Sequence, residues 1–331
     1  MASLFGAFDV RVDPWEINYG SETPLEGVSE SESEDVAVDV EVSANTWKPV
    51  VPPSASVPEC LWFVDGVRRL ETRLLVRHEG LLLHGAFGSF AAGCVQISAG
   101  TAYFGLMKLG RQVVIGSGQT LPASVAVHDG LVYEPRSAKE SEPDAPLRTI
   151  QANMRSAEGE LARELSLFPN TLVISDGPLS FEATGRGNAV GLIKRITELY
   201  LPSIYLPLLI ALPVQTRTPL FRIRGRRGGF KRLAWYIRLA TGRVGESELH
   251  GLARLEVQED AGIDAAQKLA NLTTVLLPQF VPSRGRDPRS PQNLLPIGAL
   301  EQRLRHALGD PLLIRRWIQS LVAKETANAI A

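Results

Sequence analysis

Two acidic residues each follow a short apolar run and precede a glycine. Asp65 follows residues 60–64 and Asp176 follows residues 171–175, and both runs are rich in the β-branched and aromatic side chains that favour strands. Two buried strands that end at Asp65 and Asp176 would each carry one carboxylate out of the core, which predicts one shared site. For either Asp-Gly pair taken alone, an ordinary turn is the favoured alternative.

A third acid belongs to the helix that the sequence predicts over residues 147–168. The apolar residues of this segment recur at the period of an α-helix, and they are Leu147, Ile150, Met154, Leu161, Leu165 and Phe168. Glu158 falls within their stripe, whereas Glu160 and Glu164 fall outside it. An unpaired buried carboxylate costs several kcal/mol. Glu158 is therefore expected either to bind a cation or to pair with an arginine such as Arg155.

Converging carboxylates without a histidine or cysteine cluster are hard oxygen ligands, which suit Mg²⁺ or Mn²⁺. Two such ions about 4 Å apart can activate a water molecule and stabilise the leaving oxygen of a phosphodiester. Asp65, Glu158 and Asp176 therefore suggest a two-ion phosphodiester hydrolase. Cys60 and Cys94 lie in apolar runs without metal-site spacing and are expected to be free thiols.

Composition predicts an ordinary soluble, cytoplasmic protein. The chain has 331 residues, 44% of them hydrophobic, which is enough for one large domain or two small ones. No signal peptide is recognisable, and prolines interrupt the longest apolar stretch, residues 199–214, so no membrane span is expected.

Charge is distributed unevenly along the chain. The net charge is -1, but residues 1–50 carry eleven acids and two basic side chains, so the remainder is basic. Residues 1–56 are expected to form an acidic, partly mobile N-terminal arm, with a solvated linker at 21–46. The alternative for this linker is an acidic mimic that covers a nucleic-acid channel.

Residues 57–331 are expected to form one α/β domain, a mixed sheet flanked by helices with a β-rich insertion or sheet extension at about 98–145. An antiparallel meander is predicted over residues 69–77 and 81–97. The other elements are predicted from apolar periodicity and turn residues: strands at 179–184, 189–196, 206–212, 220–224, 233–239 and 251–257, and helices at 263–276, 297–308 and 311–328.

Basic residues gather between Arg217 and Arg232, where the sequence has no acid and three glycines. A Gly-rich basic hairpin with aromatics suits contact with a phosphate backbone, and a solvated hairpin tip is the alternative. Lys194, which follows the apolar run 190–193, could also meet a phosphate or stabilise charge near the metals, although a strand-end lysine is more often solvated. The candidate DNA contacts are Lys194, Arg222, Arg224, Arg226, Arg227, Lys231 and Arg232.

Together these segments resemble the NurA nuclease family. The resemblance is carried by FVDG at 63–66, RSAE at 155–158, VISDGPL at 173–179, VGLIKR at 190–195 and PQNLLPIGALE at 291–301. It runs from about residue 57 to the end, and DPWE at 13–16 resembles the start of bacterial members. The order and spacing of the segments are more specific than any one of them.

The resemblance implies an RNase H-like fold and a manganese-dependent DNA nuclease. Its activity would be that of a single-strand endonuclease and end-resecting exonuclease in DNA-end processing and repair. It further implies a homodimer docked on the hexameric HerA translocase. Asp65, Glu158 and Asp176 would be the metal ligands. Asn293 and Glu301 would stand where the archaeal members have a tyrosine and a histidine, so Glu301 is the candidate fourth group.

Two other functions remain open at this point. The chain could be a catalytically weak adaptor of the translocase with its acidic arm as a docking segment. It could also be an RNase H-type enzyme acting on RNA, which would need contacts to the 2′-hydroxyl that the sequence does not identify.

Overall fold

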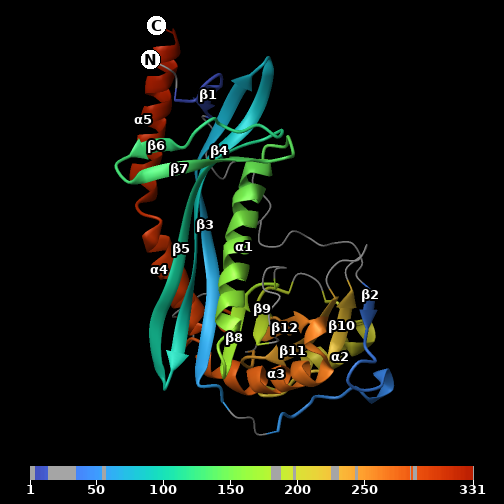
Figure 1. The fold of residues 1–331 in the computed structure, drawn as a ribbon. Helices are drawn as coiled ribbons and strands as arrows, with labels where there is room; N and C mark the ends of the chain where they lie inside the picture. The colour runs from blue at the N-terminus through green and yellow to red at the C-terminus, as the bar shows by residue number, and fades with distance from the viewer. Residues whose placement is uncertain are drawn as a thin grey trace.

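A mixed sheet of twelve strands runs through the protein in the computed structural model (Figure 1). Its strand order is β2-β10-β11-β12-β9-β8-β3-β4-β5-β7-β6, and β1 pairs with β3 beside this path. The structure describes residues 4–13, 35–53, 57–179, 188–196, 199–224, 231–242, 245–283, 285 and 289–330.

Three long antiparallel strands form the tall part of the molecule (Figure 1). They are β3 (Cys60–His78), β4 (Leu81–Ser98) and β5 (Thr101–Ile115). The meander is as predicted, but the expectation that its first strand ends at Asp65 is wrong. β3 continues for thirteen residues beyond Asp65, because its residues up to His78 pair with β4.

The remaining strands extend the sheet on both sides. On one side of β3 lie the parallel strands β8 (Thr171–Asp176) and β9 (Ala189–Ile193), followed by antiparallel pairing with β12, β11, β10 and β2. The bounds of these last four are β12 (Leu252–Gln258), β11 (Lys231–Arg238), β10 (Phe221–Arg224) and β2 (Asp35–Ala37).

Beyond β5, residues 98–145 extend the sheet through β7 (Leu131–Ser137) and β6 (Val125–His128). β1 (Asp9–Val12) pairs with the far half of β3. The N-terminal residues 4–13 therefore pack on the tall part of the sheet, where Phe5 is buried.

Helices cover both faces of the sheet. α1 (Ala145–Ser166) packs on one face of β3, β4 and β8, close to the predicted helix 147–168. α3 (Ile263–Leu276) and α4 (Leu295–Ala307) pack on the opposite face, and α5 (Pro311–Ile330) runs past β1 and β6. No helix in the described parts of the chain has the length and apolarity that crossing a bilayer requires.

Two expectations about the smaller elements are wrong. Residues 206–212, predicted as a strand, begin with α2 (Leu206–Ile210), because Pro207 sits in the first helical turn and Leu209 packs onto β10 and β11. The solvated linker predicted through residue 46 is wrong for β2, which pairs with β10, and for Glu41, whose side chain is 9% exposed, whereas Asp39, Ser43, Asn45 and Thr46 are exposed. Residues 14–16, 180–184, Arg226 and Arg227 lie outside the described residues.

Glu41 attaches the acidic segment to the body. Both its oxygens accept hydrogen bonds from Arg217, each at 2.7 Å, and the two side chains are 9% and 2% exposed. Burial alone would raise the pKa of Glu41, but the bonds and charge of Arg217 hold that pKa below its ordinary value. The pair is thus a buried, bidentate contact between the N-terminal segment and the sheet.

We expect Glu41→Ala to lower the free energy of unfolding by about 3–5 kcal/mol, because it leaves the Arg217 guanidinium buried without its counter-ion. Urea denaturation measures this. Asp9→Ala is the control, since it removes an exposed pair with Arg11 and should change stability by less than about 0.5 kcal/mol. Equal changes in the free energy of unfolding for the two substitutions would show that the Glu41–Arg217 pair does not attach this segment to the sheet.

Candidate metal centre

Asp65 and Asp176 lie side by side where the sheet divides. β3 and β8 are parallel, and their paired register ends at Val64 opposite Ser175. The next residue in each strand is the aspartate, so both side chains point to the same face. β8 ends there, and Gly177, with a φ of 90°, turns the chain away while β3 continues. The predicted shared site is thus formed by the end of one strand against the middle of another.

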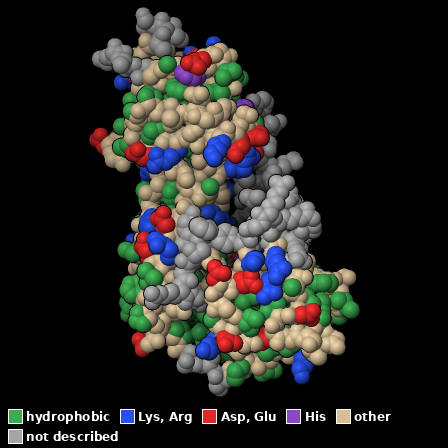
Figure 2. Space-filling view, turned by 45° about the vertical axis from the view of Figure 1, so that its right-hand side comes forward, with side chains coloured by type: hydrophobic (Ala, Val, Ile, Leu, Met, Phe, Trp, Pro, Cys, Tyr) green, Lys and Arg blue, Asp and Glu red, His purple; other side chains and the backbone are tan. Residues whose placement is uncertain are grey.

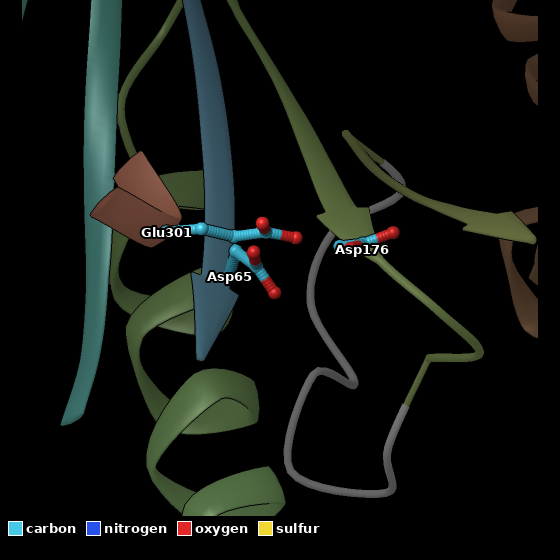
Figure 3. Close-up of side chains that lie close together, drawn as sticks. All are labelled: Asp65, Asp176 and Glu301. Carbon is cyan, nitrogen blue, oxygen red and sulfur yellow. The ribbon is translucent and has the colours of Figure 1, made fainter. Parts of the chain in front are cut away.

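Glu301 reaches the same point from α4. Leu300 and Leu304 seat this helix on Val67 and Ala91 of the sheet, which turns the neighbouring Glu301 toward the aspartates. One carboxylate oxygen from each of the three acids lies within 4.8 Å of the others. Figure 3 shows Asp65 and Glu301 pointing together toward Asp176. The structure therefore places the candidate fourth group inside the cluster.

Asp65 is the most enclosed of these acids, at 5% exposed. Its Oδ1 accepts a hydrogen bond from the Gly66 amide at 2.8 Å, but its Oδ2 is buried without a partner among the described residues. Burial, followed by the charges of Asp176 and Glu158, raises the pKa of Asp65 well above its ordinary value. A buried oxygen with no donor, facing further carboxylates, fits a hard divalent cation.

Lys194 supplies positive charge inside the cluster. Its ammonium donates to Asp176 Oδ2 at 2.5 Å and to Asn293 Oδ1 at 2.7 Å. Burial alone would lower the pKa of Lys194, but Asp176 and Asp65 raise it above its ordinary value. Burial also raises the pKa of Asp176, against the lowering effect of Lys194. Expected as a possible DNA contact, Lys194 is in this structure the counter-ion of an acid in the cluster.

Glu301 has its own counter-ion in Arg289. The guanidinium donates to both carboxylate oxygens, at 2.9 and 2.7 Å, from a position where the arginine side chain is 52% exposed. Arg289 and the Lys194 partner Asn293 lie in the irregular segment before α4, which has no periodicity. Sequence reasoning therefore gave no role to Arg289, and the only available signal was its closeness in sequence to Glu301.

Glu158 approaches from the opposite face, on α1. It is 5% exposed and passes close to Gly66, where an added Cβ would lie 2.3 Å from the Glu158 Oε1. Burial raises the pKa of Glu158 to about 7, with Arg155 acting against the shift and Asp176 adding to it. Glu158 is outside the three-acid group, but its charge acts on Asp65 and on its own neighbour Arg155. Of the two expectations for Glu158, the structure shows the pair with Arg155, at 4.0 Å, and cation binding by Glu158 stays a prediction.

The basic hairpin is only partly open to a ligand. Arg222 forms an ion pair with Glu259, and Arg232 is 8% exposed and lies 3.5 Å from the buried Glu256. Arg224 and Lys231 are exposed at the base of the hairpin. Two of the four described basic candidates in the hairpin are therefore engaged within the protein.

The sequence matches no protein-family model and no curated protein. Among solved structures, the crystal structure of the NurA nuclease from Sulfolobus solfataricus is similar to this chain, with a TM-score of 0.43 and 12% sequence identity. The match covers 80% of this chain and 86% of that chain. At this level of likeness the acids and their partners, rather than the neighbour, carry the functional conclusion.

Proposed function

We propose that this protein is a metal-dependent DNA nuclease of the NurA type, with an RNase H-like arrangement of its acids. The observation that carries the proposal is the buried, unpartnered Oδ2 of Asp65 beside the carboxylates of Asp176 and Glu301. A carboxylate cluster of this kind is suited to phosphodiester hydrolysis assisted by divalent cations. DNA, as single strand or frayed ends, is the proposed substrate, in end processing and repair.

Asp65, Asp176 and Glu301 would hold the cation directly, with Glu158 at the other face of the sheet. Mn²⁺ or Mg²⁺, as two ions, would supply a water molecule of lowered pKa and charge stabilisation for the leaving oxygen. Lys194 holds Asp176 in place and offsets negative charge where an anionic phosphate must approach. Arg289 fixes the direction of Glu301 through its two hydrogen bonds. The protein's own contribution is thus to position the acids and to balance their charge.

A non-catalytic adaptor is the second candidate function, and the ion pairs favour it. Lys194 and Arg289 already satisfy Asp176 and Glu301, so these two acids are charge-balanced without a metal. An adaptor for a HerA-type hexameric ATPase would need no cation at this site. The two functions therefore differ in whether Mn²⁺ binds.

We expect Asp65→Asn and Asp176→Asn each to reduce Mn²⁺-dependent cleavage of end-labelled single-stranded DNA by roughly a hundredfold or more, since even outer-sphere partners of a metal are worth about 10–100-fold. The assay includes EDTA, which should abolish cleavage, and is run with and without a HerA-type ATPase. Glu160→Gln is the matched control, because this acid is exposed on α1 and pairs with Lys108.

Calorimetric titration with Mn²⁺ separates nuclease from adaptor. The nuclease binds Mn²⁺ in the wild type and in Glu160→Gln, and binds it much more weakly in Asp65→Asn. A wild-type protein that binds no Mn²⁺ and leaves DNA intact would reject the nuclease, and binding of that protein to the HerA-type ATPase would then support the adaptor.

The raised pKa of Glu158 predicts a pH dependence of stability in EDTA. Between its unperturbed pKa of 4.5 and the folded value of about 7, the folded state binds more protons than the unfolded state, so stability falls as pH rises. At pH 8 we expect the free energy of unfolding of Glu158→Gln to be higher than that of the wild type by up to about 3 kcal/mol. Near pH 4.5 the two free energies should be equal. Urea denaturation at both pH values tests this. The same difference at both values would show that ionisation of Glu158 is not responsible.

A homodimer, expected from the resemblance, is supported by the outer edge of β5. Residues 101–111 pair with β4, and β7 joins β5 only at 112–115, so in the described structure this edge has no partner strand. Its side chains Tyr103, Phe104, Leu106, Met107 and Leu109 are 45–60% exposed. Figure 2 shows hydrophobic side chains gathered on the lower left of the molecule, where Figure 1 places β5. A long apolar edge pairs readily, and antiparallel pairing with its own copy is self-complementary.

We expect Leu106→Lys combined with Met107→Lys to convert a dimer into a monomer, because each copy would place two charges in the strand pair. Sedimentation velocity at micromolar concentration measures the mass. Ile204→Lys is the control, since Ile204 is 78% exposed and precedes α2, which packs on β10 and β11 on the other side of β3 from β5. A wild-type monomer, or a charged variant that remains dimeric, would argue against pairing through β5.

A further inference from the structure

Arg155 stands at the acid cluster but is only loosely engaged by it. Its Nη1 lies 4.0 Å from Glu158 Oε2, and its side chain remains 30% exposed. The charge of Arg155 also acts on Asp176, lowering the pKa that burial raises. An ion pair of this length leaves most of the five guanidinium donors available to another acceptor.

The guanidinium of Arg155 lies directly against the backbone of Gly177, the residue after Asp176. A Cβ added at Gly177 would be 2.7 Å from Arg155 Nη1 and 3.4 Å from Nη2. Any side chain at this position would displace the guanidinium. The absence of a side chain therefore allows Arg155 to lie beside the acid that ends β8.

Arg155 also begins a polar row along α1. Residues 148, 151, 155 and 158 follow one another at three or four residues, so they lie on one side of the helix. Gln151 accepts a hydrogen bond from Arg68 of β3, and Arg148 forms an exposed pair with Glu142. From Glu158 upward, the row thus presents Arg155, then Arg68 with Gln151, then Arg148. This order leads away from the acids along one side of α1.

We propose that Arg155 binds a backbone phosphate of the DNA strand immediately beside the acid cluster, and that Arg68 and Arg148 continue this path along α1. The inference rests on the proposed nuclease function and names the surface that receives its substrate. A guanidinium offers two parallel donors to a phosphate, which an ammonium does not. The β10–β11 hairpin offers fewer available side chains, because Arg222 and Arg232 are paired with Glu259 and Glu256, and of its described basic candidates only Arg224 and Lys231 are exposed. Contacts to phosphates make the binding independent of base sequence.

The test measures binding of a fluorescein-labelled 20-nucleotide oligothymidylate to the full chain by fluorescence anisotropy. Ca²⁺ replaces Mn²⁺, so that a divalent cation offsets the charge of the acids and binding is measured rather than cleavage. At 100 mM KCl we expect Arg155→Gln to weaken binding about tenfold and to reduce the slope of log K against log salt by about 0.7, the value for one phosphate contact on a single strand. Arg155→Lys should keep the salt slope and lose part of the affinity, because lysine keeps the positive charge but lacks the two parallel donors of the guanidinium.

Arg163→Gln is the matched control. It changes the same residue type on the same helix, at an exposed position about 80° around the axis from Arg155, and should bind within twofold of the wild type. Thermal unfolding followed by circular dichroism verifies that each variant is folded, and Arg155→Lys replaces Arg155→Gln if the latter is not.

The outcomes separate this inference from the proposed function. A folded Arg155→Gln that binds the oligonucleotide with wild-type affinity and salt slope overturns the phosphate contact alone. Altered Mn²⁺ affinity with unchanged DNA binding does the same, because it shows that Arg155 only positions the acids. A wild-type protein that binds no DNA overturns both. If the wild-type protein binds DNA but does not cleave it, and Arg155→Gln binds DNA more weakly than the wild type, the phosphate contact is supported and the nuclease function is rejected.

Discussion

Repulsion among carboxylates withdrawn from water is the constraint on which the centre of this structure depends. Asp65, Asp176 and Glu301 meet within 4.8 Å, and Glu158 acts on them from the other face. Burial and mutual repulsion both favour protonation of such groups. The surrounding cations offset part of this cost, and they come from three separate segments: Arg155 from α1, Lys194 after β9, and Arg289 before α4. The acids are therefore kept together only if these three segments are correctly packed.

The division of the sheet explains how acids from both faces reach one point. β8 ends at Asp176 whereas β3 continues, so among the described residues this edge of β3 has no partner strand between Asp65 and Leu74, where β1 begins to pair with it. Gly66 leaves room for Glu158 on the face covered by α1, and α4 delivers Glu301 on the other. An uninterrupted sheet would have separated the two faces. A ligand beside Asp176 can therefore meet acids from one face and the guanidinium of Arg155 from the other.

Residues 35–53, the described C-terminal part of the acidic segment, belong to the folded body. β2 completes the β10 edge, and Glu41 accepts hydrogen bonds from Arg217 and Gln267, while Asn271 accepts a bond from Arg217. Composition suggested a solvated linker here because acids are rarely buried without partners. The partner lies 176 residues away in the chain, so no local pattern could identify it. The paired edge also protects β10 from association with other strands.

The sequence by itself determined the elements whose signal is local. Apolar periodicity predicted α1, α3 and the two C-terminal helices, and the strand-like runs before Asp65 and Asp176 identified the two acids that meet. The position of Glu158 around the helix predicted that it is the buried acid of this segment, because apolar periodicity indicates which face of a helix is buried. Glu301 was found by resemblance to a family, since nothing in its own segment distinguishes it. Only the tertiary structure decided that β3 continues past Asp65, that Lys194 pairs with Asp176, and that Arg222 and Arg232 are already engaged. Such pairings depend on strand register and on the packing of distant segments, because an ion pair forms wherever the fold brings opposite charges together, whatever their separation in the chain.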